Sequence, residues 1–97
     1  MKSTSVMKLM QESFDSLLRS EILETAIAVT PDTVILGTGS FLNSLGFVTF
    51  ISDMEERVSA VTGKEQYLVL TEIHEFNADQ AFLSAGTLAR YIEKITE

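Results

Sequence analysis

Apolar residues recur at helical spacing in three long segments of the chain. In the first segment, residues 5–23, the apolar positions step mainly by three and four and polar residues fill the opposite side; these positions are Val6, Met10, Phe14, Leu17, Leu18 and Ile22. Such spacing places one apolar stripe along a helix, and the serines at positions 3 and 5 offer oxygens for its N-cap. We therefore expect an amphipathic helix over residues 5–23.

The clearest helical period covers residues 44–61. Its apolar stripe steps by four, three, four and three, through Phe47, Ile51, Met54, Val58 and Val61. Asn43 precedes the segment as an N-cap, and Gly63 follows where a left-handed residue ends a helix. A third helix is predicted over residues 85–96. Ser84 is its N-cap, and its apolar positions are Leu88, Tyr91, Ile92 and Ile95.

The segments between these helices have no long period. The connection over residues 25–43 contains Pro31 and the Gly37-Thr38-Gly39 turn, and its apolar triplet 34–36 predicts that it crosses the core. Residues 67–73 fit a short strand or an extended apolar connector, and the flanking helices favour the connector. Residues 77–82 predict a short helical turn capped by Asn77. The expected fold is all-α, a single four-helix-bundle domain over residues 1–97 with three longer helices, one short helix and a long loop between the first and second.

The composition limits the function further. The 97 residues include 14 acidic and 7 basic side chains, a net charge of −7, so the clustered lysines and arginines that nucleic-acid binding needs are missing. The acidic surface favours partners with basic patches. Without cysteine, a thiolate nucleophile is excluded. The sequence lacks a span of ~20 apolar residues and the apolar run of a secretory signal, so we expect a cytoplasmic monomer that does not insert into membranes.

Ser44 is the residue whose position suggests chemistry. It lies between the glycine turn and the predicted second helix, where free backbone N–H groups and the positive end of the helix dipole gather. A phosphate attached to this hydroxyl would be stabilised by the same field. The alternative is that Ser44 only helps to cap the helix.

Three other patterns are weaker indications of a catalytic or binding site. The sequence around Ser44 lacks the first glycine of a hydrolase nucleophile elbow, since Leu42 stands there. The single histidine, His74, lies near Glu72 and Glu75, but neighbours on one turn rarely converge on a metal ion. The glycine turn at 37–39 lacks the rest of a P-loop or a dinucleotide fingerprint. We therefore expect neither catalytic activity nor a metal site.

The sequence around Ser44 resembles the acyl carrier protein family. The resemblance rests on Leu42-Asn43-Ser44-Leu45-Gly46-Phe47 and on Ile51-Ser52-Asp53-Met54-Glu55-Glu56-Arg57-Val58, and the layout extends it over residues 5–95. Members of this family carry Asp-Ser-Leu at the start of the second helix, followed by an apolar stripe and an acidic pair. This chain departs from them at Asn43, where the family has an acid, and in a longer, more apolar segment between residues 63 and 77.

The resemblance implies that Ser44 carries 4′-phosphopantetheine, transferred from coenzyme A by a phosphopantetheinyl transferase. The arm would hold an acyl or aminoacyl group as a thioester, and the apolar core would accommodate or exclude this cargo. The partners would be the transferase and enzymes of fatty-acid, polyketide or related biosynthesis, which dock through basic patches. The residues expected to contact them are Asn43, Leu45, Val48, Thr49, Ser52, Asp53 and Glu56. The alternative is a small helical interaction module in which Ser44 is only a helix cap.

Overall fold

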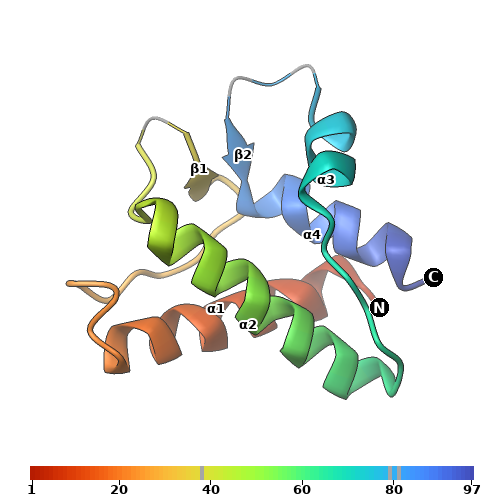
Figure 1. Ribbon diagram of the computed structural model, residues 1–97, viewed down its shortest axis with the longest axis horizontal. Helices are drawn as coiled ribbons and strands as arrows, with labels where there is room; N and C mark the ends of the chain where they lie inside the picture. Colours follow the sequence, from red (N-terminus) through yellow and green to blue (C-terminus); the bar gives the residue numbers. More distant parts are fainter. Residues whose placement is uncertain (38, 79, 81) are drawn as a thin grey trace.

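Four helices and a small sheet make up the regular structure of the computed structural model, which describes residues 1–37, 39–78, 80 and 82–97. In chain order the elements are α1 (Ser3–Arg19), β1 (Val34–Leu36), α2 (Ser44–Thr62), α3 (Leu70–Phe76), β2 (Leu83–Ser84) and α4 (Ala85–Ile95). Helix α1 packs against both α2 and α4, and α3 packs against α4 (Figure 1). The described part of the chain is thus mostly helical, as predicted. Within it, each helix is too short or too polar to span a bilayer.

The core lies where α1 meets α2 and α4. Phe14 of α1 and Phe50 of α2 meet edge to face, with ring centroids 5.1 Å apart. The predicted stripes are buried at most positions, and Leu18, Ile22 and Ile95 pack at the edge of the core. Val61 was wrongly predicted to be buried. Its side chain is 59% exposed because the buried row of α2 ends one turn earlier, at Val58.

The first helix runs from Ser3 to Arg19, whereas the prediction placed it over residues 5–23. It therefore begins two residues earlier and ends four residues earlier than predicted. The predicted serine caps were wrong, since Lys2 occupies the N-cap position without a side-chain hydrogen bond. The Glu93 carboxylate of α4 instead accepts hydrogen bonds from the N–H and hydroxyl of Ser3. At the other end, Glu21 takes a left-handed conformation with φ of 64°, which turns the chain away from the helix axis.

The prediction of an all-α fold missed a two-stranded antiparallel sheet. Strands β1 and β2 pair Val34 with Ser84 and Leu36 with Leu83, with an irregularity between the two pairs. The predicted crossing of the core is confirmed at Ile35, which is fully buried. The connection between α1 and α2 is therefore an ordered wall of the domain.

The short helix lies before Asn77, so the helical turn predicted over residues 77–82 was wrong at the described residues 77, 78, 80 and 82. Helix α3 ends at Phe76, and the N–H of its C-cap Asn77 bonds to the carbonyl of Ile73 at 3.0 Å. Residues 67–69 form the predicted extended connector, whereas residues 70–73 already belong to α3. Thr38 of the predicted glycine turn, and residues 79 and 81 of the predicted helical turn, lie outside the described residues.

Candidate functional site

Asn43 caps the N-terminus of α2. Its side-chain Oδ1 accepts the N–H of Gly46 at 2.7 Å, and its carbonyl accepts the N–H of Phe47 at 2.8 Å. The first bond satisfies one of the N–H groups that a helix start leaves open, and the second is the first regular bond of the helix. The predicted N-cap is thereby confirmed, as is the left-handed Gly63 (φ 72°) at the other end of the helix.

Ser44 is the first residue of α2 and its side chain is exposed. Within the described residues its Oγ makes no hydrogen bond, because the capping bond belongs to Asn43. The first turn of α2 contains no acidic residue. A hydroxyl at this position thus faces solvent, beside the positive end of the helix dipole and with no carboxylate in the same turn.

The chain around Ser44 is fixed by close packing. A Cβ atom placed on Gly46 would lie 3.3 Å from Asn43 Oδ1 and 3.5 Å from Ile22 Cγ2. The contact with Asn43 would be tight, whereas Ile22 of the loop after α1 lies at ordinary van der Waals distance. Before the helix, Ser40 Oγ donates to the Ile35 carbonyl at 2.7 Å and accepts the N–H of Leu42 at 3.0 Å. Both contacts hold the start of α2 at a defined place.

Exposed apolar residues lie within four positions of Ser44 in the sequence. The predicted partner residues Leu45 and Val48 are 71% and 55% exposed, and Phe41, which the sequence analysis did not single out, is 62% exposed. An aromatic residue in a loop just before a helix cap was the available signal for Phe41. Together these three residues form an apolar surface next to Ser44.

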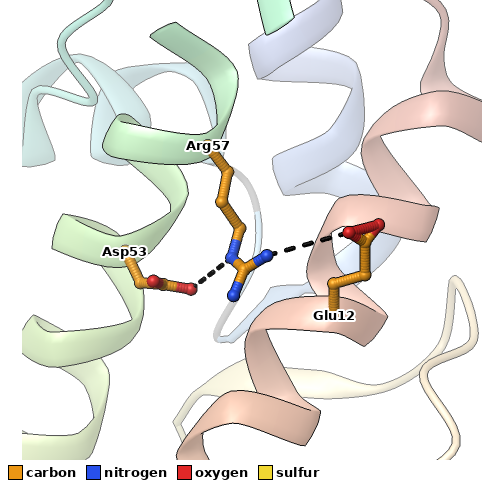
Figure 2. Close-up of polar contacts among 3 residues, drawn as sticks. All are labelled: Glu12, Asp53 and Arg57. Carbon is orange, nitrogen blue, oxygen red and sulfur yellow. Dashed lines mark hydrogen bonds and ion pairs between the residues drawn. The ribbon is translucent and has the colours of Figure 1, made fainter. Parts of the chain in front are cut away.

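The negative charge of α2 is partly neutralised. Arg57 lies between two carboxylates: its Nε is 2.6 Å from Asp53 Oδ2 on α2, and its Nη1 is 3.7 Å from Glu12 Oε1 on α1 (Figure 2). Glu55 Oε2 accepts the N–H of Leu68 at 2.9 Å. Within the described residues, Glu56 is the acid of α2 that has no ion pair or hydrogen bond.

The other predicted contact residues differ in exposure. Asn43, Ser52 and Glu56 are exposed, whereas Thr49 and Asp53 are half-buried. Thr49 Oγ1 donates to the Leu45 carbonyl at 2.8 Å, and Asp53 is held by Arg57. Both side chains bond within their own helix, which turns them away from full exposure.

A pocket of about 220 Å³ opens between β1, α2 and α3. Phe47 contributes to its wall one turn after Ser44, and the other walls include Leu36, Leu70, Ile73, Phe82 and Leu83. His74, Asn77 and Gln80 add polar groups. The sequence analysis missed this pocket because α3 and the strand pairing, which bring its walls together, were not predicted.

His74 and the neighbouring acids do not converge. His74 lines the pocket, whereas Glu72 Oε1 accepts the Tyr91 hydroxyl at 3.1 Å on the α4 side. Burial, followed by this hydrogen bond, raises the pKa of Tyr91 above its ordinary value. The described residues hold no group of three or more His, Asp or Glu side chains placed to bind a metal ion.

The geometry around Ser44 combines an accessible hydroxyl, a cap supplied by its neighbour, an apolar surface and a pocket one turn away. We compared the chain with models of protein families, with curated proteins and with solved structures, and none of them matches it. The assignment of a function therefore depends on this geometry.

Proposed function

We propose that this chain is a carrier protein of the acyl carrier type, a four-helix domain whose Ser44 carries 4′-phosphopantetheine. A phosphopantetheinyl transferase would attach the arm from coenzyme A. The terminal thiol of the attached arm supplies the thioester that holds an acyl or aminoacyl group. The chain itself performs no catalysis in this proposal; it holds the arm and presents the cargo to other enzymes.

The observation that carries the proposal is the accessible hydroxyl of Ser44 at the first position of α2, next to a cap that is already filled. A modifying enzyme could reach this oxygen without breaking the capping bond of Asn43. The phosphodiester would then lie beside the first-turn N–H groups and the positive end of the helix dipole, which favour an anion.

The pocket beside Phe47 supports the storage part of the proposal. It is bounded mainly by apolar side chains and lies one helical turn from the attachment residue. An acyl group that leaves water for such a pocket gains free energy in proportion to the apolar area it buries. We therefore propose that the pocket shelters a short acyl cargo between transfers.

The surface around Ser44 supports the docking part of the proposal. Leu45 and Val48 offer exposed apolar contact area, and Glu56 adds an unpaired carboxylate within the described residues. Apolar anchors supply affinity, while complementary charge raises the rate of encounter with a basic partner. The proposed partners are the transferase and the acyl-processing enzymes, and the cytoplasmic location and monomeric state stay predictions.

The proposal is tested by loading the arm. Incubation with coenzyme A and a broad-specificity phosphopantetheinyl transferase should add the mass of one arm to the wild-type chain, as measured by mass spectrometry. Ser44→Ala should show no gain. Ser52→Ala, which removes another exposed serine from the same helix, should be loaded like the wild type, and circular dichroism should show that both variants are folded.

The second candidate is the helical interaction module, and the exposed row of Phe41, Leu45 and Val48 favours it. A module of this kind would use the apolar surface to bind a protein without any attached group. The absence of a mass gain with several different transferases would contradict the carrier and leave the module as the better account.

A further inference from the structure

A second pocket, which shares no lining residue with the apolar pocket described above, is formed by the loop that joins α1 to α2. It has a volume of about 220 Å³ and is lined by Ile22, Leu23, Glu24, Thr25, Ile27, Phe41 and Asn43. A pocket of this size can admit one side chain of a partner protein.

The chemistry of the lining residues favours a cation with an apolar stem. Glu24 supplies a carboxylate, and it has no ion pair or hydrogen bond within the described residues. Phe41 supplies an aromatic ring that is 62% exposed. A cation is attracted both to a carboxylate and to the face of an aromatic ring. Ile22 and Ile27 offer apolar contact for the methylene groups behind the charge.

The charge of the surrounding segment points in the same direction. Residues 20–52 contain the acids Glu21, Glu24 and Asp32 and no lysine or arginine. Farther along α2, Asp53 is already paired with Arg57. The loop between α1 and α2 therefore carries acids without a basic residue in the same segment, and such a charge attracts positively charged groups.

We propose that this pocket, here called the loop pocket, binds one arginine side chain of a partner protein. The planar guanidinium can stack on Phe41 and donate hydrogen bonds to the Glu24 carboxylate at the same time, which a lysine ammonium cannot do equally well. Since Asn43 belongs both to the loop pocket and to the start of α2, an arginine bound there orients its protein over Ser44. That this partner is a transferase or an acyl-processing enzyme rests on the proposed function, whereas the binding of arginine does not.

The test uses the full chain without an attached arm. The protein, labelled with ¹⁵N, is titrated with N-acetyl-arginine amide at constant ionic strength, and amide chemical shifts are recorded by NMR. We expect saturable shifts confined to residues 22–27 and 41–43. N-acetyl-citrulline amide, which has nearly the same shape and no charge, should cause much smaller shifts.

Two matched variants locate the binding. Glu24→Gln should weaken the binding of the arginine derivative by about three- to tenfold, whereas Glu21→Gln, with the same change of charge on an exposed acid outside the loop pocket, should leave it within about twofold. Phe41→Leu should weaken binding although the apolar contact is largely kept, because the aromatic face is lost.

The proposal is overturned by any of three results: no saturable shift, equal shifts with the citrulline derivative, or equal weakening by the two glutamate variants. Because no arm and no transferase are present, these results are independent of whether Ser44 can be loaded. A chain that binds arginine but is never loaded would disprove the carrier function and leave the loop pocket intact.

Discussion

Asn43 accepts the N–H of Gly46, and this bond leaves the hydroxyl of the next residue outside the hydrogen bonding that begins the helix. A serine at the cap itself would use its oxygen for the backbone and would release that bond when modified. Placing the cap one residue earlier separates helix stability from the chemistry of Ser44. The two roles can therefore be tested by changing Asn43 alone.

Replacing Asn43 with alanine should lower the free energy of unfolding by about 1 kcal/mol, because the first turn loses its side-chain acceptor. Asn43→Asp should retain the stability, since a carboxylate accepts the same bond and interacts favourably with the helix N-terminus. If the carrier function holds, Asn43→Asp should also be loaded faster, because it restores the acid of the acyl carrier family. Urea unfolding followed by circular dichroism measures the first effect, and an Asn43→Ala variant as stable as the wild type would contradict it.

The caps show which residue roles can be predicted from sequence. Asn43, Gly63 and Ser84 act on backbone groups within a few positions of themselves, so their roles follow from local sequence. The start of α1 could not be predicted in this way. Its Ser3 bonds to Glu93, ninety positions away, and only the packing of α1 on α4 brings the two together.

At the scale of the elements, Arg57 joins α2 to α1 and also lowers the negative charge of α2 (Figure 2). Its two partners are Asp53 and Glu12, and all three side chains are partly exposed. Ion pairs with this exposure contribute little to stability, typically less than about 1 kcal/mol. Their larger effect is on the charge that a partner protein meets.

If the proposed carrier function holds, Arg57→Gln should increase kcat/KM for loading by a phosphopantetheinyl transferase at low ionic strength, because Asp53 and Glu12 become available to a basic partner. The gain should vanish at high salt, where the charges are screened. Arg90→Gln on α4 is the matched control, with the same change in net charge on another element. Equal gains in both variants would mean that overall charge, and not the α2 face, guides docking.

A second contact between elements joins the start of helix α4 to the turn before β1. The N–H of Gly86 bonds to the Pro31 carbonyl at 2.9 Å, and a Cβ atom on Gly86 would lie 3.0 Å from that same oxygen and 3.1 Å from Pro31 Cβ. A methyl group on Gly86 would therefore require Pro31 to move by a few tenths of an ångström. This close approach fixes the long connection against the start of α4.

Overpacking in Gly86→Ala should cost about 1–3 kcal/mol. The gain of about 1 kcal/mol that alanine brings to a helix offsets part of this cost, so we expect a net destabilisation of up to about 2 kcal/mol. Thermal or urea unfolding measures the difference. Stability equal to that of the wild type or higher would mean that the Pro31 turn moves aside without cost.

The elements that the sequence analysis missed are short and depend on distant partners. Strands of three and two residues carry no readable period, and β1 pairs with β2 across the intervening α2 and α3. Helix α3 has apolar residues at Leu70, Ile73 and Phe76, a spacing of three that was available but brief. Asn77 misled the prediction because asparagine is favourable at either end of a helix.

For the whole molecule, the predicted single core and mostly helical character followed from α1, α2 and α4, whose periods are long. The two pockets could not be predicted, because each is bounded by segments that meet only in the folded chain. Helix α3 lines the pocket beside Phe47 and packs against α4. It is tied to α4 by the Tyr91–Glu72 hydrogen bond and by Phe76, whose ring centroid lies 5.8 Å from that of Tyr91.

Alkaline pH should weaken the hydrogen bond between Tyr91 and Glu72 that joins α4 to α3. Burial and the Glu72 carboxylate raise the pKa of Tyr91 above its ordinary value of 10.0, so the folded state holds the proton more tightly than the unfolded state. The stability that this linkage contributes is complete below pH 10.0 and is lost as the pH rises through the higher folded-state pKa.

In a Tyr67→Phe background, ultraviolet absorbance reports the ionisation of Tyr91 alone, since the chain has two tyrosines. We expect a midpoint above 10.0 that falls on adding Glu72→Gln but stays raised, because burial is the larger cause. A midpoint at or below 10.0 would mean that α3 does not stay packed on α4 in solution, and the pocket beside Phe47 would then lack a stable wall.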